Sequence, residues 1–512
     1  MCAIFSAARW NVSWHGSLPL PRGLPTAYVL PMKKPVFSTI AAAFVLASRV
    51  HAADDPYLTA AHALANGRAQ DAVAAFGEAM TREPDSVTGH FQKALDWRGK
   101  QKWEHAMDEL NAALAVAPGH APSLAMRGIL QYELQKFDLA IADADAALKS
   151  DPGNAFAHFV KARVFMMPAT FDPVRNRREV DEAIKLDPTF ATAYRHRSGT
   201  HRISRELEAA LADATRAIEL EPTVAENYRV RAWSLSELNR WKDALPDCEQ
   251  AAKLEPENAE YRTWQADARF LTGDLDGAAS AAAEAVRVDR RGYYKFGASF
   301  IRARALSRLQ RFEEARGAFD LAVQHEPKRE EALAGRAFVR MMTGDTEGAL
   351  RDAKRLHVDE KSLMFRAWTF LALARYDEAS QIARGALKGA DWSLAMTPYA
   401  AIVASIADAN RGKTAEAQAV LAEAAGRIDA KQWPGPIIAF LTKNQTKETL
   451  LAAAKDNGQQ TEAHAYIGIQ AAIAGRRDEA LEHLGWVRDH GNKDFSEYSL
   501  SLATIHRLPP AP

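Results

Sequence analysis

The stretch that decides the fold runs from Ala191 to Pro256 and reads ATAYRHRSGTHRISRELEAALADATRAIELEPTVAENYRVRAWSLSELNRWKDALPDCEQAAKLEP. When it is laid over itself at an offset of 34 residues, identical residues coincide along its length. The coinciding pairs are Tyr194/Tyr228, Arg195/Arg229, Arg197/Arg231, Ala210/Ala244, Leu211/Leu245, Asp213/Asp247, Ala217/Ala251, Leu220/Leu254, Glu221/Glu255 and Pro222/Pro256. A strict period of this size predicts a tandem array of helix–turn–helix repeats.

The same repeat extends in both directions from this stretch, marked by alanine in its second helix and by proline after it. Small residues let the two helices approach closely, and proline ends the second helix because it cannot continue one. The alanines are Ala72, Ala106, Ala140, Ala210, Ala244, Ala278, Ala315, Ala349, Ala379, Ala417 and Ala480. The prolines are Pro84, Pro118, Pro152, Pro188, Pro222, Pro256 and Pro327.

This pattern resembles the tetratricopeptide repeat. The resemblance is fullest in Gly128…Ala140…Ala147…Pro152, in Ala72-x3-Phe76-x2-Ala79…Pro84 and in Ala315-x3-Phe319-x2-Ala322…Pro327. It covers about Tyr57 to Leu508. It implies an all-α fold, a right-handed α-solenoid of about eleven to twelve tandem helix–turn–helix units, each packed on its neighbours.

Four segments are expected along the chain. Residues 1–31 lack periodicity and represent a mis-assigned upstream start or an unstructured extension, and residues 32–52 form a signal peptide. Residues 53–430 hold the repeat array. Residues 431–512, which begin at Trp433-Pro434-Gly435-Pro436, hold a C-terminal repeat-like unit and a capping helix. This tail is similar to that of exported bacterial tetratricopeptide proteins, in which such a segment closes the superhelix.

Residues 32–52 show the three parts of a secretory signal peptide. Met32-Lys33-Lys34 is basic, residues 36–47 are apolar, and Ala52 supplies a small residue before Ala53. The apolar run is shorter than the roughly 20 residues that a membrane-spanning helix needs. No cysteine stands directly after the run, where a lipid-anchored protein would carry one. We therefore expect a periplasmic protein that is not lipid-anchored and has no integral membrane span after processing.

The charge balance argues against nucleic acid as a partner. The chain of 512 residues has a formal net charge of +0 and 25% charged residues. The first 52 residues contain lysines and arginines but no aspartate or glutamate, so the processed chain carries a net negative charge. Proteins that bind nucleic acid are usually basic on at least one face.

No sequence motif predicts catalysis, a metal site or a cofactor. The chain contains no His-Glu-x-x-His, no phosphate-binding glycine-rich loop and no Gly-x-Ser-x-Gly. His196 and His201 are five residues apart, so they do not share a helix face. Cys248 would be alone after processing, and its position predicts a small buried side chain. We therefore expect a protein that is not an enzyme.

The third repeat, Ala155 to Pro188, departs from the pattern. Residues 167–173 (MPATFDP) interrupt it and add two residues, and residues 175–178 (RNRR) stand where a helix usually starts. We interpret the interruption as an insertion tolerated at a loop tip. The alternative is a binding loop on one face of the array.

The inner surface of such an array is lined by the first helix of each repeat. Counting back from the prolines locates the inward-facing positions of these first helices. They hold Arg163, Arg195, Arg202, Arg229, Trp233 and Arg304, with the aromatic residues Phe159, Phe270, Phe300, Phe338 and Trp368 among them. Arginines and aromatic residues dominate binding hot spots, and a guanidinium suits carboxylates. The alternative is that the arginines are solvated and the aromatic residues fill seams between repeats.

These features favour a non-catalytic scaffold or adaptor of the bacterial cell envelope. It would bind segments of one or more partner proteins in the inner groove. The alternative is a binding module for an anionic cell-wall or polysaccharide ligand, which would use the same arginines.

Overall fold

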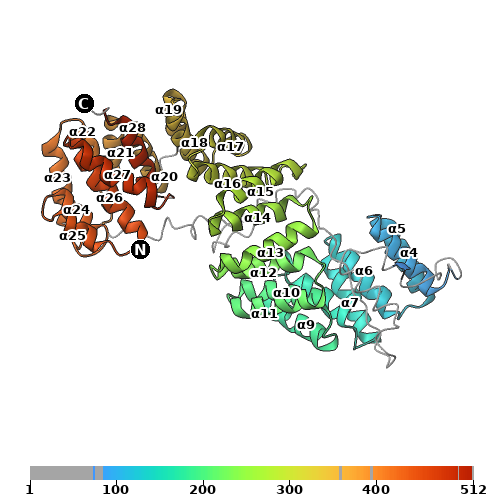
Figure 1. Ribbon diagram of the computed structural model, residues 1–512. Coiled ribbons are helices and arrows are strands. Elements are labelled where there is room, and N and C mark those ends of the chain that lie inside the picture. Colours follow the sequence, from blue (N-terminus) through green and yellow to red (C-terminus); the bar gives the residue numbers. More distant parts are fainter. Residues whose placement is uncertain are drawn as a thin grey trace. The chain divides into compact units, whose positions relative to one another are not determined.

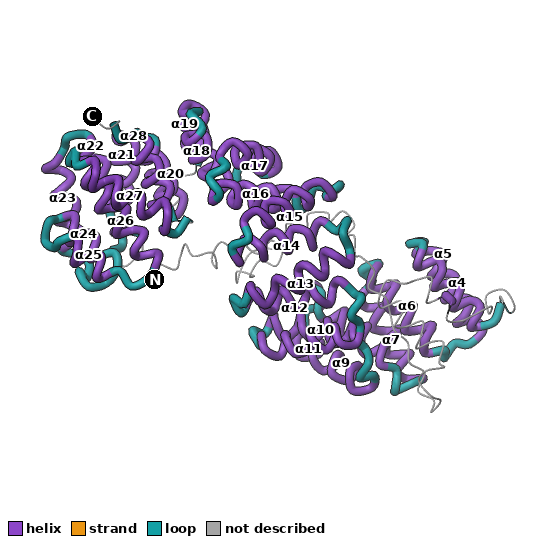
Figure 2. The backbone as a smooth tube through the Cα atoms, in the orientation of Figure 1, coloured by secondary structure: helices purple, strands orange, loops and turns teal. Residues whose placement is uncertain are grey.

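The computed structural model describes residues 73–74, 83, 85–356, 360–392, 396–493 and 495–509. In these ranges it contains 25 α-helices, one short 3-10 helix and no strand (Figures 1 and 2). The described residues up to Glu255 form one compact unit, the N-terminal unit, and those from Pro256 form the C-terminal unit. The extension (1–31) and the signal peptide (32–52) lie outside the described residues, and the boundary at residue 431 stays a prediction.

The N-terminal unit consists of consecutive helix pairs, in which each second helix packs on the first helix of the next pair. A 3-10 turn, η3 (Pro168–Thr170), lies inside the third pair. The helices are α4 (Val87–Gly99), α5 (Trp103–Val116), α6 (Ala121–Glu133), α7 (Phe137–Ser150), α8 (Ala155–Phe165), α9 (Pro173–Leu186), α10 (Ala191–Ile203), α11 (Leu207–Leu220), α12 (Ala225–Glu237) and α13 (Trp241–Leu254).

The C-terminal unit continues the pairs, has two short helices after α23 and ends on α28. Its helices are α14 (Ala259–Thr272), α15 (Leu275–Val288), α16 (Lys295–Arg308), α17 (Phe312–His325), α18 (Glu330–Met342), α19 (Thr346–Arg355), α20 (Glu360–Ala372), α21 (Tyr376–Leu387), α22 (Thr397–Asn410), α23 (Thr414–Ala425), α24 (Gly435–Leu441), α25 (Lys447–Ala453), α26 (Asn457–Ile473), α27 (Arg477–His490) and α28 (Ser496–Arg507). None of the described helices is both long and apolar enough to cross a membrane.

The alanine and proline positions do what the sequence predicts. Every predicted alanine in the described residues, from Ala106 to Ala480, is at most 2% exposed. Each described proline of the series stands two residues beyond the end of a second helix, as Pro222 does after Leu220. Ala72 and Pro84 lie outside the described residues. The expected all-α repeat solenoid is confirmed.

First helices form the inner face of each unit. Neighbouring first helices pack on each other, as α6 does on α8, α10 on α12 and α18 on α20, whereas contacts between successive second helices are weaker. Closer spacing on one side bends a stack of helix pairs toward that side. The inner face of the N-terminal unit is therefore lined by α6, α8, α10 and α12, through the side chains that point away from the second helix of each pair.

The third pair is complete despite its irregular sequence. Asp172 caps α9, accepting a hydrogen bond from the backbone N–H of Arg175 at 2.9 Å, and Pro173 takes the first helical position. Asn176 replaces the usual alanine and is fully buried. Its amide donates to the Ala162 carbonyl at 2.6 Å, and its carbonyl accepts from the Thr200 hydroxyl at 2.7 Å. Residues 175–178 lie inside the helix, and the added residues are absorbed in the turn.

Close contact between α26 and α27 gives a first prediction. A Cβ added at Gly468 would lie 2.6 Å from Leu484 Cγ and 3.1 Å from the Leu484 backbone nitrogen. Gly468→Ala should therefore lower the free energy of unfolding by about 1–3 kcal/mol. At Gly485 on α27 a Cβ meets nothing within 4 Å. Gly485→Ala should instead add up to about 1 kcal/mol through helix propensity.

Urea unfolding monitored by circular dichroism would compare the two variants, which carry the same substitution in the same helix pair. Equal effects of the two substitutions would contradict the close crossing of α26 and α27.

Candidate protein-binding surface

The structure places five of the six predicted surface residues in the N-terminal unit. Arg163 lies near the end of α8, Arg195 and Arg202 on α10, and Arg229 and Trp233 on α12. The sixth, Arg304, lies on α16 of the C-terminal unit. The predicted surface is thus divided between two units, and each part is described separately.

Arg202, Trp233 and Arg229 form one cluster. The guanidinium carbon of Arg202 lies 3.5 Å from the centroid of the Trp233 ring, and that of Arg229 lies 5.2 Å from it. Glu237 pairs with Arg202 at 2.9 Å, and Glu226 pairs with Arg229 at 2.6 Å. The two arginine side chains are 19% and 13% exposed, and Trp233 is half-buried. The cluster is therefore held in place from both sides while part of it still faces solvent.

Arg163 and Arg195 are more deeply placed. Arg163 is 5% exposed, lies 4.2 Å from the Tyr132 ring centroid and pairs with Glu133 at 3.3 Å. Arg195 is 7% exposed and donates to the Asn227 side-chain carbonyl at 2.7 Å. Both contacts join first helices of neighbouring pairs. These two arginines support the inner face from beneath rather than offering a guanidinium to a partner.

His196, on α10, lies beside these two arginines. Burial, together with the positive charges of Arg163 and Arg195, lowers the pKa of His196 to about 3. The imidazole is therefore neutral at pH 7 and makes a 2.8 Å hydrogen bond with Asn176. Within the described residues no group of three or more histidine, cysteine or acidic side chains could hold a metal ion.

Arg304 has a similar setting in the C-terminal unit. Its guanidinium carbon lies 4.4 Å from the Phe270 ring centroid and 5.8 Å from that of Phe300. Asp267 on α14 is its nearby acid. Burial raises the pKa of Asp267 to about 6, and the positive charge of Arg304 opposes that rise. Arg304 therefore lies in an aromatic environment with a carboxyl that is only weakly acidic.

The acidic partners of the arginines were not predicted from the sequence. Glu133 and Glu237 are the last residues of α6 and α12, so they hold equivalent places in their repeats. Each lies beside the arginine of a neighbouring first helix. A comparison of that one position across repeats would have revealed them. Because these carboxylates offset the arginines, the surface is less suited to a polyanion than its arginine content indicates.

A second set of charges was also missed. Four bidentate pairs join the first helix of a repeat to its own second helix, always 16 residues apart. They are Arg127–Asp143, Arg197–Asp213, Arg231–Asp247 and Arg336–Asp352, with nitrogen–oxygen distances of 2.6–2.8 Å. The aspartate raises the pKa of the arginine in the first three pairs through a direct hydrogen bond. These pairs hold helices together and lie apart from the inner face.

The helix pairs, their period and their packing define the chain as an all-α repeat solenoid. A family model described as tetratricopeptide repeat matches residues 125–167 and 229–294. The chain is thus a tetratricopeptide-repeat protein, as the sequence resemblance predicts. Repeats of this kind generally mediate protein–protein interactions. No curated protein matches the chain.

Several solved structures are similar to parts of the chain. YrrB, described as a TPR protein with an unusual peptide-binding site, is 21% identical with a TM-score of 0.34, over 37% of this chain and 95% of its own. PilF of Pseudomonas aeruginosa is 15% identical with a TM-score of 0.37, over 44% and 96%. A tetratricopeptide repeat protein of Parabacteroides merdae is 16% identical with a TM-score of 0.37, over 49% and 98%. Similarities of this size carry no information on function.

Proposed function

We propose that this protein is a non-catalytic scaffold of the bacterial cell envelope that binds a segment of a partner protein on the inner face of its N-terminal unit. The cluster of Arg202, Trp233 and Arg229 carries the proposal. Tryptophan and arginine dominate binding hot spots, and a stacked guanidinium loses little freedom when a partner arrives. The basic, apolar and small segments of residues 32–52 support export to the envelope.

The cluster favours a protein partner over an anionic glycan. Arg202 and Arg229 already pair with Glu237 and Glu226, so a polyanion would have to displace two carboxylates or lie beside them. A protein segment can instead cover the Trp233 ring and donate its own hydrogen bonds to the same carboxylates. Apolar contact with a few polar contacts around it is the usual composition of an interface core.

The test is affinity capture with the full chain, expressed in its host with a C-terminal tag and cross-linked before extraction. Trp233→Ala and Arg202→Ala should each reduce recovery of a stoichiometric partner by roughly tenfold or more, the effect of losing a hot-spot residue. Arg216→Ala is the matched control, since Arg216 pairs with Glu219 at 2.9 Å on the second helix α11.

Fractionation of the same cells tests the location. The tagged chain should be recovered from the periplasm, with an N-terminus at Ala53. Unchanged recovery of the partner by both cluster variants would reject the proposed surface, and a chain that stays in the cytoplasm would reject the envelope assignment.

A further inference from the structure

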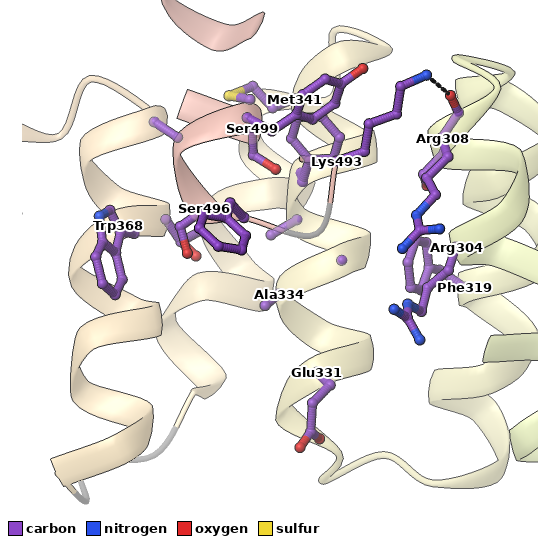
Figure 3. A pocket seen from close by; sticks show the side chains of 18 of the residues that line it. Arg304, Arg308, Phe319, Glu331, Ala334, Met341, Trp368, Lys493, Ser496 and Ser499 are labelled. Atoms are coloured by element: carbon purple, nitrogen blue, oxygen red, sulfur yellow. Dashed lines mark hydrogen bonds between the residues drawn. The ribbon is translucent and has the colours of Figure 1, made fainter. Parts of the chain in front are cut away.

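The C-terminal unit folds its last segment back over its own inner face. Helix α28 packs against α26 and α27 and also against α18 and α20. Tyr498 and Leu502 on α28 belong to a cluster with Phe312 and Phe338, which come from α17 and α18. Lys493, just before α28, donates from its ammonium to the carbonyl of Arg308 at 2.9 Å (Figure 3). The inner face from α16 to α20 therefore has a second wall.

A cavity of about 180 Å³ remains between these walls. Phe300, Phe338, Trp368 and Phe495 are among the aromatic residues that line it. Space for it exists because α18 presents two small residues here, Ala334 and Gly335. Ala334 holds the repeat position that Arg195 and Arg229 hold in the N-terminal unit. A Cβ on Gly335 would approach Phe319 Cζ to 2.3 Å, so this wall is closely fitted. A cavity of such a size accommodates one aromatic ring.

Charge is distributed unevenly around the cavity. Arg304, Arg308 and Lys493 lie at the side formed by α16, and Trp368 lies at the opposite side (Figure 3). Glu331 is the one acidic side chain among the described lining residues, and it lies away from the three cations in the same view. Asp267, the acid near Arg304, is not among the residues that line the cavity. The guanidinium carbons of Arg304 and Arg308 lie 4.4 and 4.1 Å from the centroid of the Phe270 ring. Stacking on this ring fixes both guanidinium groups. Fixed cations beside apolar walls suit a carboxylate attached to an apolar body.

We propose that this cavity binds an organic acid with a single aromatic or branched apolar group, whose carboxylate faces Arg304, Arg308 and Lys493 while its apolar group enters between Phe338 and Trp368. The site is in the C-terminal unit and does not involve Trp233. It is thus a second binding activity that goes beyond the partner surface of the N-terminal unit. The same chemistry is offered by a free small acid and by the C-terminal residue of a peptide.

The experiment is isothermal titration of the full, processed chain with 3-phenylpropionate, with 3-phenylpropionamide as the uncharged probe. The acid should bind at least tenfold more tightly than the amide, because only the acid can use the three cations. Arg304→Gln and Lys493→Gln should each remove most of that difference. Arg316→Gln is the matched control, since Arg316 on the second helix α17 is 39% exposed and does not line the cavity.

Ala334→Leu tests the shape of the site, since it should fill the cavity and abolish binding of acid and amide alike. Circular dichroism would show whether this variant folds; if it does not, Arg304→Gln, which leaves the hydrogen bond from Lys493 to the Arg308 carbonyl in place, carries the test. Gly-Gly-Phe and its C-terminal amide form the peptide arm. Binding of the peptide acid alone would identify a chain terminus as the source of the carboxylate. Equal affinity for acids and amides, or no binding of either acid, would overturn the proposal.

Discussion

Asp352→Ala is expected to destabilise the C-terminal unit by about 3–5 kcal/mol, the cost of removing one partner from a buried ion pair. Asp352 is 1% exposed. It accepts hydrogen bonds from Arg336 at 2.7 and 2.6 Å and from Arg340 at 2.9 Å. Without its carboxylate, the two guanidinium groups lose their buried anionic partner and keep the more exposed Asp320 and Asp345.

Hydrogen exchange of the α18 and α19 amides would measure this loss locally, which matters because a chain with two compact units need not unfold in one step. Asp320→Ala is the control: Asp320 lies 2.9 Å from the same Arg336, but its side chain is 47% exposed. An exposed pair contributes about 0–1 kcal/mol. Equal effects of the two substitutions would show that burial of the Arg336–Asp352 pair is not what stabilises this helix pair.

The sequence predicts the fold well because the same residue type recurs at the same packing position in successive repeats. One buried alanine such as Ala210 means little, but the same residue at the same step in successive repeats identifies a helix crossing. The prolines set the helix ends in the same way. Even the irregular third repeat keeps its place, since Asp172 and Pro173 restart the helix.

Contacts that occur once are not repeated in the sequence, so they could not be predicted from it. Lys493 and Arg308 are 185 residues apart, and no periodic signal links them. The return of α28 onto α18 and α20, and with it the cavity, depends on such contacts. Burial of Arg163 and Arg195 was missed for a related reason: periodicity places a side chain on the inner face but does not say that Glu133 or Asn227 will cover it.

A buried acidic cluster that includes α28 gives a prediction of pH-dependent stability. Glu462 on α26 is 3% exposed and accepts hydrogen bonds from the Tyr399 hydroxyl at 2.8 Å and the Trp433 indole at 2.9 Å. Glu497 on α28 is 4% exposed and accepts from the Tyr466 hydroxyl at 2.7 Å. Burial raises the pKa of Glu462 well above its ordinary value of 4.5, and the negative charge of Glu497 adds to the rise. Burial also raises the pKa of Glu497.

The sign of the pH dependence follows from these shifts. Below pH 4.5, the ordinary value, both carboxyls are protonated in the folded and unfolded chain, and the stability that they contribute is fully present. As the pH rises through the raised folded pKa values, the unfolded chain releases protons that the folded chain still holds, and stability is lost. Each unit of upward shift costs about 1.4 kcal/mol once the pH exceeds both values.

Glu462→Gln should therefore make the protein more stable than the wild type at pH 9, since glutamine keeps an oxygen acceptor for Tyr399 and Trp433 and carries no charge. The advantage should shrink as the pH falls toward 4.5, where the wild-type carboxyl is neutral as well. Thermal unfolding from pH 5 to 9 would measure the advantage at high pH and its decrease at low pH. Glu448→Gln is the control, because Glu448 is an exposed glutamate on α25. A Glu462→Gln curve parallel to the wild-type curve would mean that Glu462 is ionised in the folded protein. The same substitution should also hold α28 in place at high pH, because it removes the charge that faces Glu497.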